Sequence, residues 1–237
     1  RLTALCEGRD SASRQARGVE FAAKAYGHHG VAARLASDQP HQGVARQWFR
    51  APDVLALLPF NQPTPGASYG LVWSVPAERA EALLAMAPED FERELNTATE
   101  GSAGCLQLGS ERAAWPLMLA AASEVSGEGW VLLGDAAHLV HPLAGQGLNL
   151  GLADVACLSR VLAGRESWRS LGDARLLRRF ARERYLPNLA MGQLTDALQR
   201  LFASDAGLVR EARNRGLTAL NHLPPLKRWL TQRALGL

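Results

Sequence analysis

One stretch of the sequence stands apart from the rest: Gly129-Trp-Val-Leu-Leu-Gly-Asp-Ala-Ala-His-Leu-Val-His-Pro-Leu-Ala-Gly-Gln-Gly-Leu-Asn-Leu-Gly-Leu-Ala-Asp154. Residues 130–133 are all apolar and predict a short buried strand that ends at 134–135. Glycine and proline punctuate the following residues up to 147 and predict a loop. Apolar residues at helical spacing predict a helix from Leu148 onward. The stretch therefore predicts a strand, a loop and a helix in direct succession.

The polar groups of this stretch suit a particular kind of ligand. Asp135 follows the end of the predicted strand, where a carboxylate can accept hydrogen bonds from the hydroxyl groups of a sugar or ribityl chain. The Gly145-Gln146-Gly147 turn opens the helix, so bare backbone N–H groups and the helix dipole can approach an anionic group closely. These two devices together predict a ligand that carries both a polyol and delocalised negative charge.

Other readings of the stretch fit less well. Its glycines do not form G-x-G-x-x-G, the usual dinucleotide fingerprint, and no G-K-[ST] of a phosphate loop is present. His138 and His141 could suggest a metal, but no third ligand is evident nearby, and Pro142 disfavours a continuous helix across the pair. We expect no metal site.

The rest of the chain predicts a mixed architecture. Short apolar runs between Tyr26 and Trp73 alternate with turn residues, which favours an antiparallel sheet. Residues 76–98 are helical in pattern, with a break at Pro88, and further strands are expected near 105–108 and 114–119. From Leu148 onward the period is helical. The predicted fold class is α+β.

Composition excludes several classes of protein. The chain has 237 residues, of which 47% are hydrophobic and 21% charged, an ordinary globular balance. The longest apolar run, 113–122, contains a proline and is too short to span a membrane, which needs about 20 residues. Three cysteines without a CxxC pair disfavour a metal cage or disulfide framework, so a reducing cytoplasm is expected.

Charge is distributed unevenly along the chain. Residues 1–158 hold 11 Lys and Arg against 17 Asp and Glu, a net of −6, whereas 159–237 hold 15 against 6, a net of +9. The basic part predicts either a face for an anionic membrane or a partner, or a solvated helical face. Few aromatic residues interleave the arginines, so no nucleic-acid partner is expected.

The 129–154 stretch resembles a known motif. Its form, GDAAHxxHPLAGQGxNxGxxD, is similar to the second flavin-binding motif of the FAD-dependent aromatic hydroxylases, the class A flavoprotein monooxygenases, and most of all to their ubiquinone-biosynthesis branch. Segments 26–30, 41–49 and 55–59, and the C-terminal 223–237, resemble the same branch. The resemblance implies a para-hydroxybenzoate-hydroxylase-like α+β fold.

A second motif near the start agrees with this resemblance. Residues 6–14, Cys-Glu-Gly-Arg-Asp-Ser-Ala-Ser-Arg, resemble ADGxxSxxR, with Glu7 in place of the usual Asp. Family members also carry G-x-G-x-x-G for the ADP half of FAD, and these 237 residues contain no such fingerprint. The resemblance therefore implies the C-terminal two-thirds of a hydroxylase.

The resemblance also implies site residues and domains. Asp135 matches the ribityl-hydroxyl acceptor, Pro142 matches the proline beside the flavin ring where oxygen reacts, and the glycine turn matches the N–H groups at the pyrimidine end of the ring. The implied domains are 1–18, a remnant of the FAD-binding domain; 19–128, an antiparallel-sheet substrate domain; 129–165, an FAD-binding strand-loop-helix; and 166–237, C-terminal helices. The implied catalytic residue is Pro142, and the implied cofactor-binding residues are Glu7, Gly8, Arg14, Gly134, Asp135, Gly145, Gln146, Gly147, Leu148 and Asn149.

The implied function is hydroxylation of an aromatic ring. FAD, NAD(P)H and O2 are the implied cofactors and co-substrate, a C4a-hydroperoxyflavin is the implied oxidant, and a polyprenylated phenol of ubiquinone biosynthesis is the implied substrate. The 237 residues alone are expected to be inactive. Two alternatives stay open: a hydroxylase of a soluble aromatic acid, and a non-catalytic assembly module of a quinone-biosynthesis complex. Such a complex is an expected partner, and the expected location is cytoplasmic, peripheral to the inner membrane.

Overall fold

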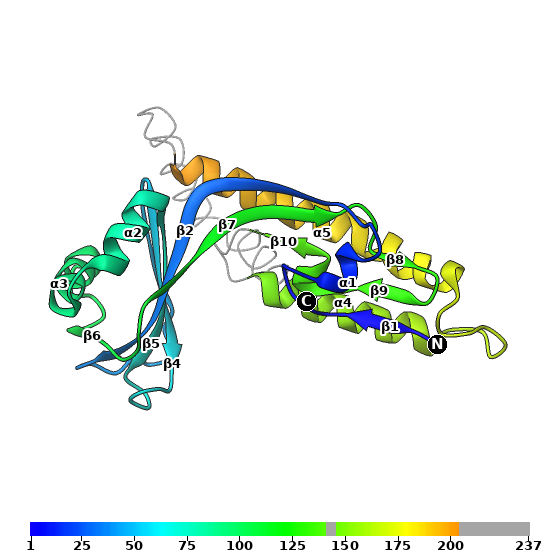
Figure 1. Ribbon diagram of the computed structural model, residues 1–237. Coiled ribbons are helices and arrows are strands. Elements are labelled where there is room, and N and C mark those ends of the chain that lie inside the picture. The colour runs from blue at the N-terminus through cyan, green and yellow to red at the C-terminus, as the bar shows by residue number, and fades with distance from the viewer. Residues whose placement is uncertain (141–145, 204–237) are drawn as a thin grey trace, which may run out of the picture. The chain divides into compact units, whose positions relative to one another are not determined.

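The computed structural model describes residues 1–140 and 146–203. They form two compact units (Figure 1). The first unit contains residues 1–24 and 118–201, and the second contains 25–117 together with the described residues 202–203. The predicted domain boundaries, including those of a substrate domain at 19–128, stay predictions.

An antiparallel sheet forms the second unit. In hydrogen-bonded order it runs β7, β2, β5, β4, β3, and β6 also pairs with β2. The strands are β2 (Phe21–Ser37), β3 (Arg46–Arg50), β4 (Asp53–Phe60), β5 (Ser68–Pro76), β6 (Leu106–Leu108) and β7 (Ala113–Ala122). Strands β2 and β7 each continue into the first unit. The prediction of an antiparallel sheet in an α+β fold is confirmed.

One face of this sheet is buried by two helices, α2 (Ala77–Ala85) and α3 (Pro88–Thr99) (Figure 1). Alternate residues of the strands point into the core, because successive side chains of a strand lie on opposite faces. The core side chains are Val31, Leu35, Leu55, Leu57, Leu71, Trp73 and Val75 from the strands, and Leu83, Phe91 and Leu95 from the helices. The predicted helix break at Pro88 is confirmed, since α3 begins there.

Strand β2 is much longer than the sequence indicates. Only its second half, 31–35, has the alternation of apolar residues that predicts a strand, but the structure extends it over 17 residues. Apart from Phe21 and Tyr26, the first half is built from alanine, glycine, lysine and histidine, which carry little hydrophobic pattern. At Gly30 an added Cβ would lie 3.3 Å from Leu117 Cδ2, so a small residue fits the packing there.

The first unit contains a small sheet whose central strand comes from the 129–154 stretch. Strand β9 (Trp130–Leu132) pairs in parallel with β1 (Thr3–Leu5) and antiparallel with β8 (Ser126–Gly127). In the parallel pair Thr3 faces Trp130, so residues far apart in sequence lie side by side. Strand β10 (His138–Leu139) belongs instead to the larger sheet, where it pairs with β7.

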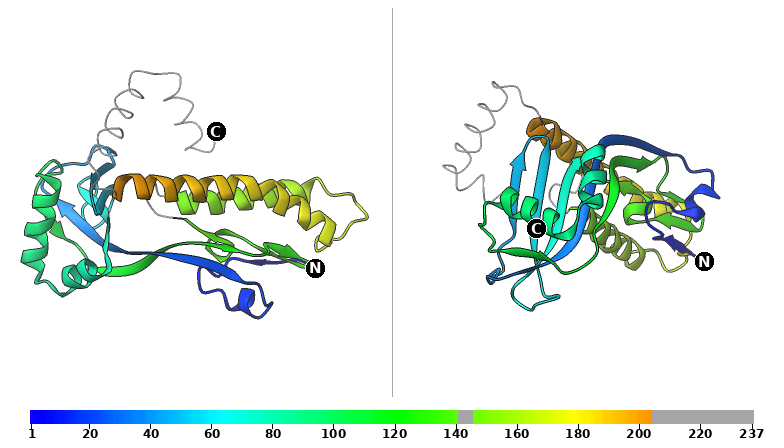
Figure 2. Two further views of the ribbon diagram at one scale, coloured as in Figure 1. Left: turned by 90° about the horizontal axis from the view of Figure 1, so that it is seen from above. Right: turned by 60° about the vertical axis from the view of Figure 1, so that its left-hand side comes forward.

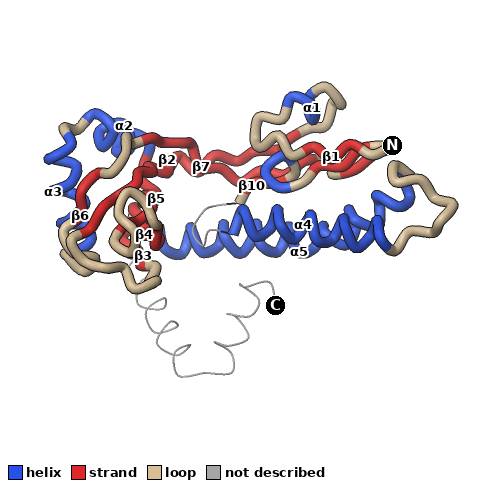
Figure 3. Tube along the Cα trace, turned by 90° about the horizontal axis from the view of Figure 1, so that it is seen from below, coloured by secondary structure: helices blue, strands red, loops and turns tan. Residues whose placement is uncertain are grey.

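Two long helices, α4 (Gln146–Ala163) and α5 (Ala174–Ala203), run side by side in the first unit (Figures 2 and 3). Their apolar faces meet β9 in a core that contains Val131, Leu133, Leu158, Leu177 and Phe180. Leu132 points to the opposite side of β9 and packs with Leu5 and Ala136. No helix among the described residues is long and apolar enough to cross a membrane.

The loop between α4 and α5 is held by one arginine. Arg169 donates to Glu166 at 2.7 Å and to Asp173 at 2.8 Å, and its side chain is only 10% exposed. Asp173 also accepts from the backbone N–H groups of Arg175 and Leu176, so it caps α5. The ion pairs therefore fix the loop to the start of the next helix.

Candidate functional site

The predicted strand-loop-helix begins as the sequence indicates. Directly after β9, Gly134 opens a short 3-10 turn, η1 (Gly134–Ala136), with a φ of +58°. This is the left-handed region that glycine occupies without steric cost. Asp135 follows in the same turn and is exposed. Its carboxylate therefore stands at the carboxyl end of β9, accessible to the hydroxyl groups of a ligand.

The first turn of α4 is open to an approaching ligand. The helix begins at Gln146, two residues before the predicted start, and its first N–H groups have no partner within the helix. At Gly147 an added Cβ would meet no atom within 4 Å, and the backbone has no positive φ. Leu148 and Asn149 are exposed beside it. Neither the backbone nor the packing of the described residues demands a glycine at position 147.

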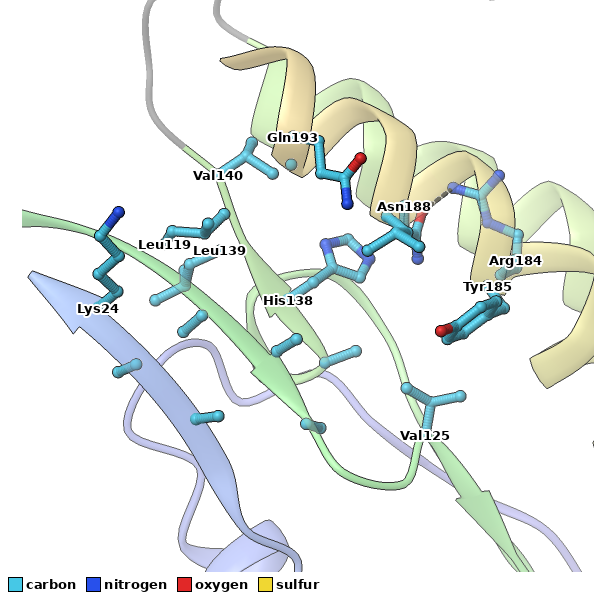
Figure 4. A pocket seen from close by; sticks show the side chains of 18 of the residues that line it. Lys24, Leu119, Val125, His138, Leu139, Val140, Arg184, Tyr185, Asn188 and Gln193 are labelled. Atoms are coloured by element: carbon cyan, nitrogen blue, oxygen red, sulfur yellow. Dashed lines mark hydrogen bonds between the residues drawn. The ribbon is translucent and has the colours of Figure 1, made fainter. Parts of the chain in front are cut away.

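A buried carboxylate joins this turn to both long helices. Asp154, 1% exposed, accepts from the backbone N–H of Gly134 at 3.0 Å and lies 2.7 Å from His138 Nε2. Its other oxygen accepts from Arg184 Nε on α5 at 2.7 Å. Arg184 also donates to Asn188 at 2.8 Å, a bond drawn in Figure 4. Strand end, β10, α4 and α5 therefore meet at one side chain.

These contacts set the charge of Asp154. Burial raises the pKa of the carboxyl, but hydrogen bonds from His138, Arg184 and the Gly134 N–H outweigh burial and leave the pKa below its usual value. Asp154 is therefore ionised at neutral pH and compensates the charge of Arg184 inside the protein.

Turn η1 and helix α4 also approach each other directly. An added Cβ at Gly151 would lie 3.3 Å from the Cα of Gly134, closer than an ordinary contact. Glycine at 151 lets the two backbones pack together, one helical turn beyond Gly147. The exposed Asp135 and the open start of α4 are thus held to one rigid base.

The N-terminal motif forms a compact turn around Glu7. Its carboxylate accepts from the hydroxyl groups of Ser11 and Ser13, both at 2.6 Å, and from the Ser13 N–H at 3.0 Å. The Ser11 hydroxyl, followed by the two Ser13 groups, lowers the pKa of Glu7 to about 2. Gly8 has a φ of +78°, which explains its place in the turn. Both oxygens of Glu7 thus hold the start of α1 (Ala12–Gln15).

Arg14, also a predicted cofactor residue, is buried and ties α1 to the η1 turn. It is 3% exposed and donates to the Ala136 carbonyl at 2.9 Å and to the Arg9 carbonyl at 2.8 Å. Its guanidinium lies 3.8 Å from the centre of the Phe21 ring. The structure therefore connects the two sequence motifs, although they lie more than 120 positions apart.

Three further predicted residues fall at or beyond the edge of the described chain. Pro142 and Gly145 lie in 141–145, outside the described residues, and of Gln146 only the helical backbone is described. The cofactor roles of all predicted residues stay predictions. Among the described residues no group of three or more His, Cys, Asp and Glu could hold a metal ion.

Sequence reasoning did not identify the network around Asp154. Asp154 ends the quoted motif and His138 lies inside it, so both could have been paired as complementary groups on opposite sides of the loop. Arg184 stands 30 positions further on, in a segment with many arginines, and nothing in the sequence distinguishes it.

The family of the chain follows from comparison with known proteins. The family model described as FAD binding domain matches residues 1–191, so the chain belongs to this FAD-binding family. It is 34% identical over 237 residues to ubiquinone hydroxylase UbiL of Rhodospirillum rubrum, covering 100% of the chain and 54% of that protein. It is 33% identical to the mitochondrial ubiquinone biosynthesis monooxygenase COQ6 of Xenopus tropicalis, covering 93% and 54%. The chain spans about half the length of these relatives.

Solved structures share the fold. The p-nitrophenol 4-monooxygenase PnpA of Pseudomonas putida superposes with a TM-score of 0.73 at 16% identity, covering 97% of this chain and 57% of that one. The probable FAD-dependent monooxygenase PqsL of Pseudomonas aeruginosa gives 0.69 at 22% identity, covering 86% and 56%. The predicted para-hydroxybenzoate-hydroxylase-like fold class is confirmed.

The described residues fit the ribityl and flavin part of FAD. Asp135 offers an exposed acceptor for ribityl hydroxyls, and Gly147 leaves free space above the N–H groups that open α4. The dipole of an 18-residue helix favours negative charge at that end. Both groups belong to the same strand-turn-helix.

Proposed function

We propose that the protein containing this chain is an FAD-dependent monooxygenase that hydroxylates an aromatic ring, of the ubiquinone-hydroxylase type. One observation carries the proposal: among the described residues, no atom would lie within 4 Å of a Cβ added at Gly147 in the first turn of α4, and Asp135 is exposed at the end of β9, on the same strand-turn-helix. A glycine that the protein's own packing does not require is explained by a ligand that approaches the backbone. The two relatives, a ubiquinone hydroxylase and a ubiquinone biosynthesis monooxygenase, support the choice of reaction.

In this proposal, the residues of the chain bind the cofactor and hold it in position. Asp135 accepts hydrogen bonds from the ribityl chain, and the N–H groups near Gly147 stabilise negative charge on the pyrimidine end of the ring. Asp154 and Arg14 hold the turn that carries Asp135. Bound FAD, reduced by NAD(P)H, supplies the activation of O2. Pro142 is the residue we place beside the ring.

The substrate we propose is a polyprenylated phenol. The names of both relatives refer to ubiquinone. A polyprenylated phenol has a reactive phenol ring and a long apolar chain. A soluble aromatic acid would need a cationic group to bind its carboxylate, whereas a prenylated phenol needs apolar space.

The experiment that tests this proposal replaces Gly147 in the flavin-loaded protein. Gly147→Val should lower the FAD content and the hydroxylation rate, because the branched side chain blocks the backbone; each lost N–H contact to a charged group is worth roughly 1.5–3 kcal/mol. Gly147→Ala is the smaller control. Unchanged flavin content and turnover in Gly147→Val would refute the assignment, and a protein without bound flavin in any variant would favour an assembly module.

We also propose that residues 1–237 alone bind FAD weakly. They contain no G-x-G-x-x-G to hold the ADP half of the cofactor, which leaves the ribityl and flavin contacts to supply all the affinity. Equilibrium titration with FAD, followed by quenching of flavin fluorescence, measures this. Tight stoichiometric binding would contradict it.

We further propose that a groove of arginines contacts an anionic membrane, one of the alternatives that the basic part of the sequence left open. It is lined by Arg169, Arg175, Arg178, Arg179, Arg182 and Tyr185 at the start of α5. Arg169 and Arg179 both pair with Glu166. Among the described residues, no carboxylate lies within ion-pair distance of the other three arginines. Those three can therefore contact phosphate groups.

A further inference from the structure

The first unit contains an apolar cavity of about 480 Å³ beneath α5. Strands β2, β7 and β10 form one wall and α5 forms the other (Figure 4). The volume is in the range of small-molecule sites, about 300–1,000 Å³. We call it the α5 cavity.

Small residues make this space. The strands contribute 22–23 and 120–122, which are all alanine, and α5 contributes Ala181 and Gly192. At Gly192 an added Cβ would already lie 3.3 Å from Leu119 Cδ1. Because larger side chains on these elements would fill the cavity, its size depends on these alanines and the glycine.

Four of the six polar side chains of the wall already have partners, and Tyr185 and Gln193 are the other two. His138 bonds to Asp154, Arg184 bonds to Asp154 and Asn188, and Lys24 pairs with Asp196 at 3.5 Å. A ligand in the cavity would therefore meet mainly alanine, leucine and valine surface, and an apolar ligand would lose no hydrogen bonds there.

The residues that line the cavity extend along α5, and different residues lie toward its two ends. Gln193, Asn188 and Tyr185 follow one another along its α5 wall (Figure 4), and eight residues of helix span about 12 Å. One end reaches Val140, and Pro142 follows Val140 by two positions in the sequence. The other end shares Ala181 and Tyr185 with the arginine groove.

From this shape we propose that the α5 cavity binds the aliphatic chain of the substrate. The inference rests on the proposed function, since it assumes a phenol ring held near Pro142. The chain would then run from Val140 along α5 toward Tyr185 and the arginines. The occupant is a flexible branched or linear hydrocarbon chain, and its affinity comes from apolar burial.

A chain-length series tests the proposal by direct binding. 4-Alkylphenols with chains of two to ten carbons are titrated against the protein by calorimetry, without NAD(P)H or turnover. Affinity should rise roughly fourfold for each methylene that the cavity buries, and level off once the cavity is full. Affinity that does not depend on chain length would overturn the proposal.

Two variants reshape the cavity in opposite directions. Gly192→Leu fills the cavity and should lower the affinity for the longest phenol at least tenfold. The affinity should also stop rising at a shorter chain length than in the wild type. Leu119→Ala enlarges the cavity, so the affinity should keep rising up to a longer chain length before it reaches its plateau. Ala190→Leu, on the exposed side of the same helix, is the matched control and should change nothing. If Gly192→Leu unfolds the protein, Leu119→Ala remains as the test. An affinity plateau at the same chain length in Leu119→Ala as in the wild type would contradict the site.

The outcome also separates this inference from the proposed function. Hydroxylation that is insensitive to both cavity variants would keep the function and overturn the chain site. Chain-dependent binding to a protein that hydroxylates no phenol would keep the cavity as an apolar site but remove its role in substrate binding. Failure to bind any phenol of the series would overturn the site and indicate that another part of a longer protein covers it.

Discussion

Asp154 shows how one side chain can hold a binding turn together. It is 1% exposed, yet it serves a backbone N–H, a histidine and an arginine at once. At this position the negative charge faces a cationic partner, and both carboxylate oxygens accept hydrogen bonds. A carboxylate with three partners on three elements fixes the turn more firmly than any single pair could.

Asp154→Asn should destabilise the protein strongly. The substitution keeps the shape but leaves the largely covered Arg184 without a counter-charge. Breaking a buried pair in this way costs roughly 3–5 kcal/mol. Urea denaturation measures the free energy of unfolding. Glu183→Gln is the control, because its ion pair with Arg160 is exposed and should be worth less than about 1 kcal/mol. Equal effects of both substitutions would contradict the network.

The same variant predicts a pH dependence. The pKa of Asp154 is lower in the folded protein than in the unfolded chain, where it is about 3.9. Its stabilisation is therefore complete above that value and is lost as pH falls through the folded pKa. The difference in unfolding free energy between wild type and Asp154→Asn should shrink below about pH 4. Glu7 and Glu166, each with a pKa of about 2, titrate in both proteins and cancel. A difference that stays constant down to pH 2 would count against this reading.

At the residue scale the sequence indicates which groups are available but not their partners. Gly134, Asp135 and Gly147 could be chosen from the motif alone, because backbone freedom and strand-end position can be read locally. The burial of Arg14 could not, since its two acceptors belong to a turn far along the chain and to its own loop. Both oxygens of Glu7 accept hydrogen bonds from serines of its own segment. The presence of Glu in place of the usual Asp of the motif did not indicate these bonds.

At the element scale, helix α4 offers two glycines one turn apart with opposite surroundings. Gly151 faces the backbone of Gly134, and Gly147 faces open space. The spacing in the sequence does not distinguish them. Only the packed structure shows which glycine serves the fold and which is free for a ligand.

The same substitution at these two glycines should change the stability of the protein in opposite directions. Gly151→Leu must push α4 away from η1, and overpacking of this kind costs about 1–3 kcal/mol. Gly147→Leu meets no neighbour and should change stability by less than about 1 kcal/mol, in the stabilising direction, because leucine favours helix over glycine. Thermal unfolding of the two variants without cofactor checks this. A larger loss from Gly147→Leu would show that our assignment of the two roles is reversed.

Most elements were predictable, and the exceptions have physical causes. Helices α2, α3 and α4 and strands β4 and β5 follow their apolar periods closely. The first half of β2 was missed because alanines and glycines carry no alternation. The parallel pairing of β1 with β9 was missed because only tertiary contacts bring Thr3 beside Trp130.

At the scale of the whole molecule, charge separates along the chain and is only partly neutralised. Arg184 pairs with Asp154, in the acidic part of the sequence. Arg169 and Arg179 pair instead with Glu166, within the basic part. Among the residues that the structure describes, Arg175, Arg178 and Arg182 have no ion pair with a carboxylate.

Vesicle binding should therefore depend on particular arginines. Co-sedimentation with anionic vesicles should be strong at low salt and fall at high salt, because each close cation contributes about 1 kcal/mol, screened over a Debye length. Replacing Arg178 and Arg182 together by Gln should weaken it. Replacing Arg50 and Arg93 by Gln changes the charge equally but elsewhere, and should weaken it less. Absence of binding at low salt would rule out a direct lipid contact for this groove.

The ion pairs of Arg169 have a consequence for protease digestion. Trypsin cleaves after arginine, and the α4–α5 loop contains two of them: Arg165 is exposed, whereas Arg169 is largely covered and pairs with both Glu166 and Asp173. Limited digestion should cut first after Arg165 and spare Arg169, which yields two pieces that remain associated through the core of α4 and α5. Glu166→Gln frees one side of Arg169 and should add a second cut there, visible by mass spectrometry as a fragment shorter by four residues.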